Sequence, residues 1–237
     1  MDDAARSLIE AAARPYRPAG VSAWQRARGK LRFDPVYFSL LKRGLLPNEG
    51  TLLDLGCGQG ILLALIAAAR SQFRSGNWPA GWQTPPASLH LEGIERRSDR
   101  VAVGRTALGT EARIDQRDIR SAGFSPCSAL VILDVLLYLS EDEQLGVLER
   151  AVRALETDGV LILREADAAA GLSFKVTAWS ECLMGAVEGR SPPHLRYRRA
   201  ADWISVLEGL GMKVRAEPMS AGTPFANVLF VAKRRMP

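Results

Sequence analysis

The sequence predicts an α/β fold: an open, mostly parallel β-sheet with helices on both faces. Short apolar runs, which suit buried strands, alternate with longer segments of helical period along most of the 237 residues. The last two strand-like segments, KVRAEPM and NVLFVAKR, follow each other without a helix between them. We therefore expect a parallel sheet that ends in an antiparallel C-terminal strand pair.

Residues 1–47 are predicted to form a helical cap before the main domain, which covers residues 48–237. An alanine-rich helix is expected over residues 3–13, and the prolines of RPYRP end it. A second helix is expected to start in FDPV, where Asp34 can cap the N-terminus and Pro35 suits the first helical position.

The main domain alternates strand and helix. Predicted strands lie, in order, in GTLLDLG, LHLEGIE, EARIDQRDI, ALVILDVLLYL and GVLILRE, and predicted helices in ILLALIAAARSQF, SDRVAVGRTAL, SEDEQLGVLERAVRAL and AADWISVLEGLG. The third of these helices carries a capping-box signature, because Ser140 can cap it and Glu143 stands three residues on. A Gly/Pro/Trp-rich loop near residues 75–88 is interpreted as an insertion, and residues 166–200 as a substrate cover. This order of elements is Rossmann-like.

The composition is that of an ordinary soluble globular protein, with 47% hydrophobic and 24% charged residues. The three cysteines are far apart, so neither a disulfide framework nor a Cys-x-x-Cys metal site is indicated. An export signal and an apolar run of the ~18 residues of a membrane helix are both absent, so we expect a cytoplasmic protein. The net charge of +5 permits anionic partners, although scattered arginines are also typical of a solvated surface.

The segment LLDLGCGQG, residues 52–60, is the most informative stretch. Its three alternating glycines end a predicted strand and allow a ligand to approach the backbone closely. The dinucleotide fingerprint would need a third glycine at position 61, where Ile61 stands, so that class of ligand is disfavoured. Asp54 points the same way, because a carboxylate here would repel a pyrophosphate and attract an ammonium or sulfonium group.

Acidic residues follow each of the predicted strands of the parallel part. They are Asp54, Glu95, Asp118, Asp134 and Glu165. The carboxyl ends of parallel strands meet at one edge of a sheet, which is where α/β folds of this kind bind ligands. The sequence therefore predicts one acidic ligand site at this edge.

In motif order, residues 50–165 resemble the class I S-adenosylmethionine (SAM)-dependent methyltransferases. LDLGCGQG is similar to their first motif, LEGIE to the acidic end of the second strand, QRDIR to the turn after the third, and LDVLLYL and LETDGVLILRE to the fourth and fifth. The resemblance implies SAM as cofactor and S-adenosylhomocysteine (SAH) as product. It implies that the cofactor-binding residues are Asp54, Gly56, Cys57, Gly58, Gly60, Glu95, Asp118, Ile119 and Asp134.

Each of these residues has an implied role. The glycine turn would give close backbone approach, with Asp54 and Asp134 near the methionine part of the cofactor. Glu95 would hold the ribose hydroxyls, while Asp118 and Ile119 would border the adenine. One feature departs from the family pattern, because Glu95 follows Asp54 by 41 positions instead of the usual ~20. We interpret the excess as the loop near residues 75–88.

The methyl acceptor is expected to be a small molecule, because DVLLY replaces the N-P-P-Y that amine-methylating nucleic-acid enzymes of this fold carry. The N-terminal segment RPYRPAGVSAWQRARGKLRFDP and the ending PMSAGTPFANVLFVAKR also resemble methyltransferases of bacterial aryl-polyene pigment clusters. This second resemblance implies secondary metabolism and a phenolic or aryl acceptor, free or bound to an acyl carrier protein. An RNA methyltransferase and a non-catalytic methyltransferase-like binding module remain the alternatives.

Candidate residues for the acceptor site come from the segments after the fourth and fifth strands. His194 is the candidate general base, and Tyr138 is a second candidate for the catalytic pocket. The candidate substrate-binding residues are Arg196, Arg198 and Arg199, which would attract an anionic substrate or an acidic carrier. No metal is expected, since the acidic residues at positions 134, 165 and 167 do not form a compact ligand set.

Overall fold

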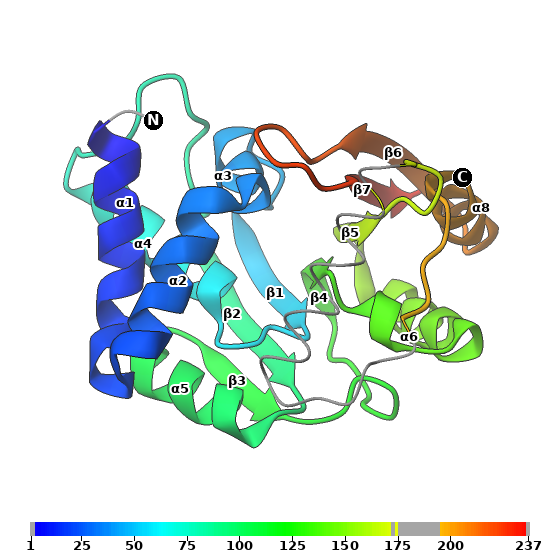
Figure 1. Ribbon diagram of the computed structural model, residues 1–237, viewed down its shortest axis with the longest axis horizontal. Coiled ribbons are helices and arrows are strands. Elements are labelled where there is room, and N and C mark those ends of the chain that lie inside the picture. Colours follow the sequence, from blue (N-terminus) through cyan, green and yellow to red (C-terminus); the bar gives the residue numbers. More distant parts are fainter. Residues whose placement is uncertain (1–2, 172–173, 175–194, 236–237) are drawn as a thin grey trace.

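The computed structural model describes residues 3–171, 174 and 195–235, which contain a seven-stranded sheet (Figure 1). The strand order is β3-β2-β1-β4-β5-β7-β6. The strands are β1 (Glu49–Leu55), β2 (Ser88–Glu95), β3 (Arg113–Gln116), β4 (Cys127–Leu133), β5 (Leu155–Ala166), β6 (Met212–Pro218) and β7 (Asn227–Arg234). Strands β1 to β5 pair in parallel, and β7 lies antiparallel between β5 and β6. The predicted fold class and its antiparallel C-terminal pair are confirmed.

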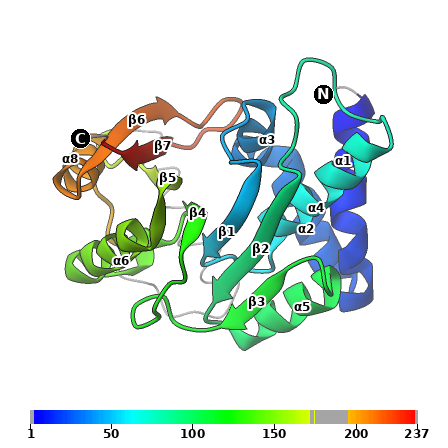
Figure 2. The same ribbon diagram turned by 180° about the vertical axis from the view of Figure 1, so that it is seen from behind.

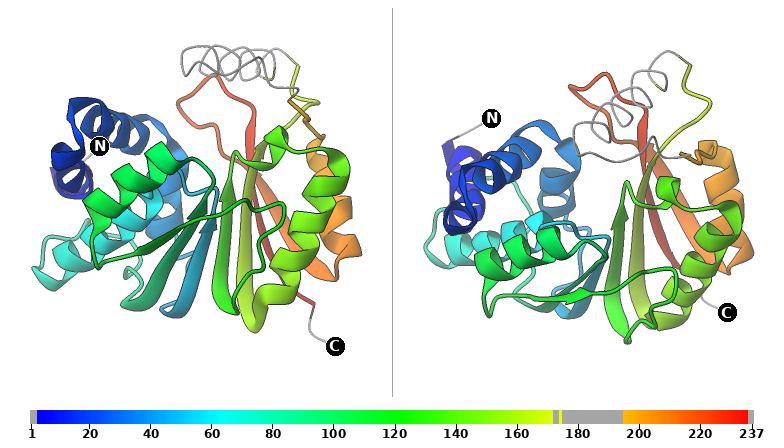
Figure 3. Two further views of the ribbon diagram at one scale, coloured as in Figure 1. Left: turned by 90° about the horizontal axis from the view of Figure 1, so that it is seen from below. Right: turned by 60° about the horizontal axis from the view of Figure 1, so that its bottom comes forward.

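Helices cover both faces of the sheet, as its edge-on view shows (Figure 3). One face carries α1 (Asp3–Ala13), α2 (Val21–Phe33), α3 (Pro35–Lys42), α4 (Ile61–Arg74) and α5 (Ser98–Leu108). The other carries α6 (Glu141–Ala154) and α8 (Ala200–Gly209). None of the helices in the described ranges is long and apolar enough to cross a membrane.

The central strands are buried on both sides, which explains their continuous apolar sequences. In β4, Ala129 and Val131 belong to the core under α1 to α5, whereas Leu130 and Ile132 belong to the core under α6 and α8. Strand β5 alternates in the same way. A strand between two helix layers has no polar face, so hydrophobic alternation disappears from its sequence.

The N-terminal cap packs along α4 and α5 (Figures 1 and 2). Helix α1 ends at the predicted prolines, which form a 3-10 helix, η1 (Arg14–Ala19). Asp34 is the N-cap residue of α3, as predicted, since its carboxylate accepts a hydrogen bond of 3.2 Å from the backbone N–H of Val36. Helix α2 corrects the sequence-based prediction, which placed no helix over these residues. Its buried stripe is narrow: it consists of Ala23, Ala27 and Leu31, spaced four apart, and two of these three side chains are only methyl groups.

The Trp/Pro loop lies between α4 and the beginning of β2. Trp82 packs edge-on against Phe38 of α3 and against Trp78, with ring centroids 5.3 and 5.6 Å apart. The loop enters β2 at its N-terminal end, and β1 and β2 then pair in register, with Asp54 opposite Gly93. The extra residues therefore lie at the far end of the sheet, and Glu95 still ends β2 beside the glycine turn.

Candidate active site

The glycine turn follows β1 and is fixed to the neighbouring strand. The backbone N–H groups of Gly56 and Cys57 both donate to the carbonyl of Ile94, at 2.8 and 3.1 Å. All three glycines have positive φ, between 58° and 73°, which residues with a Cβ rarely adopt. The local sequence thus determines a sharp turn from strand to helix at the carboxyl edge of the sheet.

The three glycines serve different purposes. A Cβ on Gly56 would lie 2.6 Å from Val135, and one on Gly60 would lie 2.7 Å from Leu108, so both are required by packing. A Cβ on Gly58 would meet no atom closer than 3.8 Å. Packing does not explain Gly58, because the space that its Cβ would occupy is open.

Glu95 lies directly beside this open space. One of its carboxylate oxygens accepts a hydrogen bond of 3.0 Å from the backbone N–H of Gly58, and the other accepts one of 2.8 Å from the backbone N–H of Arg97. A carboxylate has about four lone-pair positions. Two remain for further donors, such as the two hydroxyls of a ribose.

Asp54 is a buried carboxylate below the same turn. Burial raises its pKa to about 7, and the nearby charge of Glu95 adds to the shift. Near neutral pH the side chain is therefore partly protonated. A cation bound beside it would favour the ionised form.

The cap also reaches the glycine turn, which was not predicted. The hydroxyl of Tyr16, fully buried in η1, donates a hydrogen bond of 2.9 Å to the backbone carbonyl of Gln59. In the sequence, Tyr16 stands out only as a tyrosine between two prolines, which does not indicate a contact with the glycine turn. The N-terminal segment therefore helps to hold the glycine turn in place.

Asp118 and Ile119 lie in the turn after β3, next to the end of β2. The backbone N–H of Arg117 donates to the carbonyl of Glu95 at 3.0 Å and fixes this turn beside it. The Asp118 carboxylate accepts hydrogen bonds from the Arg120 side chain, which lower its pKa, and Ile119 is buried. The structure thus brings both residues to the predicted edge.

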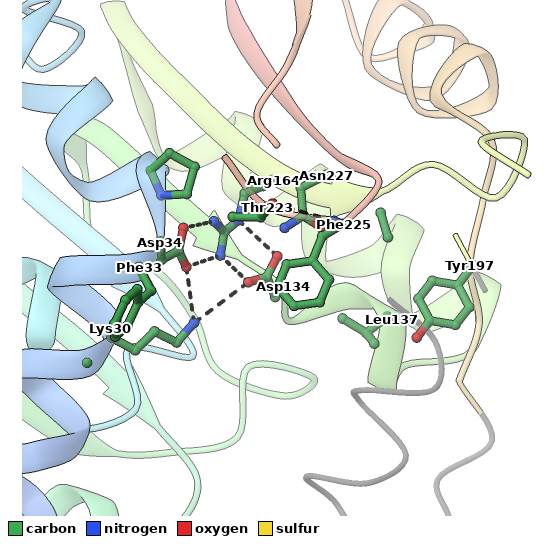
Figure 4. Close-up of a pocket in the computed structure, with 13 residues that line it drawn as sticks. Lys30, Phe33, Asp34, Asp134, Leu137, Arg164, Tyr197, Thr223, Phe225 and Asn227 are labelled. Atoms are coloured by element: carbon green, nitrogen blue, oxygen red, sulfur yellow. Dashed lines mark hydrogen bonds and ion pairs between the residues drawn. The ribbon is translucent and has the colours of Figure 1, made fainter. Parts of the chain in front are cut away.

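Asp134 follows β4 and belongs to a group of four charges (Figure 4). The guanidinium of Arg164 is 1% exposed and forms paired hydrogen bonds with two carboxylates, Asp34 and Asp134. Asp134 is also the single non-glycine residue with positive φ in the described part of the chain. We call Lys30, Asp34, Asp134 and Arg164 the charge cluster.

Lys30 completes the charge cluster from α2. Its ammonium lies 3.4 Å from Asp34 and 4.0 Å from Asp134. Its recessed position disfavours the charged form, but Tyr37 and the two carboxylates outweigh this and raise its pKa to about 12. Burial would raise the pKa of Asp34, but Arg164 outweighs it and lowers that pKa to about 2. The cluster therefore holds two positive and two negative charges.

Three members of the charge cluster were missed as site residues. Asp34 was predicted only as a helix cap. One signal was available, because Arg164 directly follows the apolar run GVLIL of a buried strand, and a buried arginine needs partners.

A cavity of about 200 Å³ opens beside the charge cluster (Figure 4). It lies at the ends of β4, β5 and β7, and its apolar wall includes Phe33, Leu137 and Phe225. Val135, the neighbour of Asp134, packs on Gly56. The cavity is therefore adjacent to the glycine turn.

Glu165 is a supporting residue rather than part of the cavity wall. It is buried, and its carboxylate accepts hydrogen bonds from the backbone N–H groups of Val135 and Leu136, at 3.2 and 2.7 Å. Burial raises its pKa well above the ordinary value. It fixes the turn that carries Asp134.

Comparisons with known proteins show which fold this arrangement belongs to. No model of a protein family matches the chain. Carboxy-S-adenosyl-L-methionine synthase of Chromohalobacter salexigens is 32% identical over 117 residues, 47% of this chain and 38% of that protein. The chain thus matches about two fifths of the length of this curated relative.

Solved structures match over most of the chain. Magnesium protoporphyrin IX methyltransferase from Synechocystis PCC 6803 with bound SAH gives a TM-score of 0.60 over 90% of this chain and 87% of that one, at 18% identity. The pyocyanin biosynthetic protein PhzM gives a TM-score of 0.63 over 91% of this chain and 59% of that one, also at 18% identity. The chain has the class I methyltransferase fold.

Within this class I methyltransferase fold, the predicted acceptor residues lie in different settings. His194 is outside the described residues. Tyr138 ends the short helix η2 (Leu136–Tyr138) and is 37% exposed. Arg196 is exposed, and its backbone N–H donates to the carbonyl of Leu137 at 2.8 Å.

The other two predicted arginines already have partners within the protein. The Arg198 side chain donates a hydrogen bond of 2.7 Å to the side chain of Gln144, and its guanidinium lies 5.5 Å from the ring centre of Trp203. Arg199 forms an ion pair with Asp202 at 3.0 Å. Neither is among the described residues that line the cavity. Across the same described residues, no group of three or more His, Cys, Asp or Glu side chains is arranged to hold a metal ion.

Proposed function

We propose that this protein is a SAM-dependent methyltransferase that acts on a small molecule. The observation that carries the proposal is the open space over Gly58, bordered by Glu95 and Asp54, at the carboxyl edge of a class I methyltransferase fold. A cavity adjoins it, as a two-substrate reaction requires. Neighbouring structures of this fold contain SAM or SAH, which supports the same cofactor here.

The chain offers suitable partners for each part of SAM. The glycine turn would approach the cofactor with its backbone, and the spare lone pairs of Glu95 suit the ribose hydroxyls. The carboxylate of Asp54 suits the ammonium of the methionine part, and Asp118 with Ile119 would border the adenine. Because Arg164 already engages the Asp134 carboxylate, we expect Asp134 to contribute through its backbone.

Bound SAM supplies an electrophilic methyl group on a sulfonium. In the transfer, the nucleophilic atom of the acceptor forms a bond to the methyl carbon, the carbon–sulfur bond breaks, and its electron pair stays on sulfur. The acceptor proton passes to a base or to water. Most of the rate enhancement would come from holding the three atoms in line, which the turn and the cavity can provide.

We infer that the acceptor is a phenolic or aryl compound of secondary metabolism, free or bound to a carrier protein. The aromatic side chains Phe33 and Phe225 on the cavity wall support an aryl group. The exposed Arg196 and the basic segment 26–32 would face an acidic carrier.

Calorimetric titration with SAM and SAH tests the proposal directly. Binding of both, followed by methylation of phenolic acids in free or carrier-bound form, is the expected result. Absence of binding would favour a non-catalytic module. Salt-sensitive RNA binding with methylation of RNA would favour the RNA methyltransferase.

The affinity for SAH is expected to depend on pH through Asp54. Its pKa of about 7 should fall when the ammonium binds, so binding releases a proton and weakens as the pH drops. Between about pH 7 and about pH 5.5 we expect a decrease in affinity on the order of tenfold. Asp54→Asn should bind with little pH dependence over this range. A flat profile for the wild-type protein would remove Asp54 from the ammonium site.

His194 is proposed to deprotonate the acceptor. His194→Ala should lower turnover by ~10²-fold, the low end for general acid–base catalysis, with unchanged affinity for SAM. His90→Ala is the matched control, because this exposed histidine lies near the start of β2, away from the site. Turnover within about twofold of wild type across the histidine titration range would exclude His194 as the base.

A further inference from the structure

The cavity beside the charge cluster presents one accessible cation. Among the described residues that line it, the cations are Lys30 and Arg164. Arg164 is buried, and its donors are occupied by two carboxylates. The Lys30 side chain is 45% exposed, and its contacts with Asp34 and Asp134 are long, at 3.4 and 4.0 Å. Its ammonium can therefore donate a further hydrogen bond into the cavity.

The walls near Lys30 suit a flat apolar group. Phe33 follows it by three residues on α2 and is 71% exposed at the cavity. Phe225 and Leu137 contribute further apolar surface from other elements (Figure 4). A cation beside aromatic walls matches a ligand with an aromatic body and one anionic oxygen.

We propose that Lys30 binds the anionic oxygen, phenolate or carboxylate, of an aromatic methyl acceptor whose ring lies against Phe33 and Phe225. This inference rests on the proposed methyltransferase function and specifies its substrate class. Lys30 would be the residue that selects ionised acceptors over neutral ones of the same shape.

The electrostatics of the charge cluster permit such an anion. Arg164 and Lys30 together balance the charges of Asp34 and Asp134, so the charge cluster adds no net negative charge that would repel an anion at the Lys30 ammonium. The raised pKa of Lys30 keeps it charged throughout the physiological range. A permanently charged ammonium stabilises an oxyanion but does not act as a base, so its role is recognition.

The position of the cavity assigns the anion to the acceptor. Glu95 ends β2, the glycine turn follows β1, and the cavity lies at the ends of β4, β5 and β7, on the far side of β4 from Glu95. A cofactor that starts at Glu95 would extend toward the cavity and direct its methyl group there. The competing source of an anionic oxygen is the carboxylate of the cofactor itself, and the experiment separates the two.

The test uses three aromatic probes with the SAH-saturated protein: benzoate, 4-nitrophenol and neutral benzyl alcohol. We expect benzoate and 4-nitrophenolate to bind at least about 10-fold more tightly than benzyl alcohol, the usual effect of a charge-assisted hydrogen bond. The bound nitrophenol should also become ionised, and yellow, at a lower pH than it does in buffer. Lys30→Met should weaken both anions by about 10- to 100-fold and abolish the spectral shift, whereas Lys30→Arg should retain both effects.

Lys42→Met is the matched control, since it removes the same charge from an exposed position on α3 outside the cavity. Equal binding of all three probes to the wild-type protein would overturn the proposal, as would unchanged anion binding in Lys30→Met. A loss of SAH affinity in Lys30→Met, with anion selectivity retained, would assign Lys30 to the cofactor carboxylate instead. Failure of the proposed function is distinguishable, because the wild-type protein would then bind no SAH in the first titration.

Discussion

Gly58→Val is expected to abolish binding of SAM and SAH while leaving the protein folded. The wild-type backbone at Gly58 faces open space, and the valine side chain would occupy the volume through which the cofactor approaches. At SAM and SAH concentrations that saturate the wild-type protein, calorimetry of the variant should give no measurable heat of binding. Its circular dichroism spectrum should show the native helix and sheet content.

The control for this variant must reproduce its backbone strain. Gly76→Val does so, because Gly76 also has positive φ, of 74°, and its Cβ would meet no atom within 4 Å. It lies just after α4, in the Trp/Pro loop, and should cost about 1–2 kcal/mol of stability without affecting the ligand. Undiminished cofactor affinity in Gly58→Val would contradict the assignment of the glycine turn.

Arg164→Met is expected to lower the free energy of unfolding by about 3–5 kcal/mol at neutral pH, because it leaves two carboxylates without their shared cation. Urea denaturation measures this change. The pH dependence has a definite sign. Arg164 depresses the pKa of Asp34 to about 2 in the folded protein, so the stability it contributes is present above the ordinary pKa of aspartate, ~3.9, and disappears as the pH falls toward 2. The difference between variant and wild type should therefore shrink in acid.

Arg153→Met is the matched control for Arg164→Met. Arg153 is exposed on α6 and lies 3.9 Å from Glu149, so its pair is screened by water. We expect little change in stability from this substitution. An Arg164→Met variant as stable as the Arg153→Met variant would contradict the stabilising role of the Arg164 ion pairs.

The local features of the site could be predicted because each depends on neighbouring residues. The strand, glycine turn and helix of residues 52–74 follow from hydrophobic period and glycine spacing. The capping box of α6 is present as predicted, with Ser140 and Glu143 bonded reciprocally at 3.3 and 2.8 Å. Helix α2 escaped prediction because its buried stripe is made mostly of alanine, which has a weak hydrophobic signal.

The sequence by itself determined the class I fold and the acidic carboxyl edge with its glycine turn. The tertiary structure alone decided how the charged side chains are used. It joined Arg164 to Asp34, 130 positions away, engaged Arg198 and Arg199 against α6 and α8, and turned Lys30 toward a cavity. The physical reason is that backbone preferences and hydrophobic period act over a few residues, whereas a buried charge is satisfied by whichever opposite charge the packed elements bring beside it.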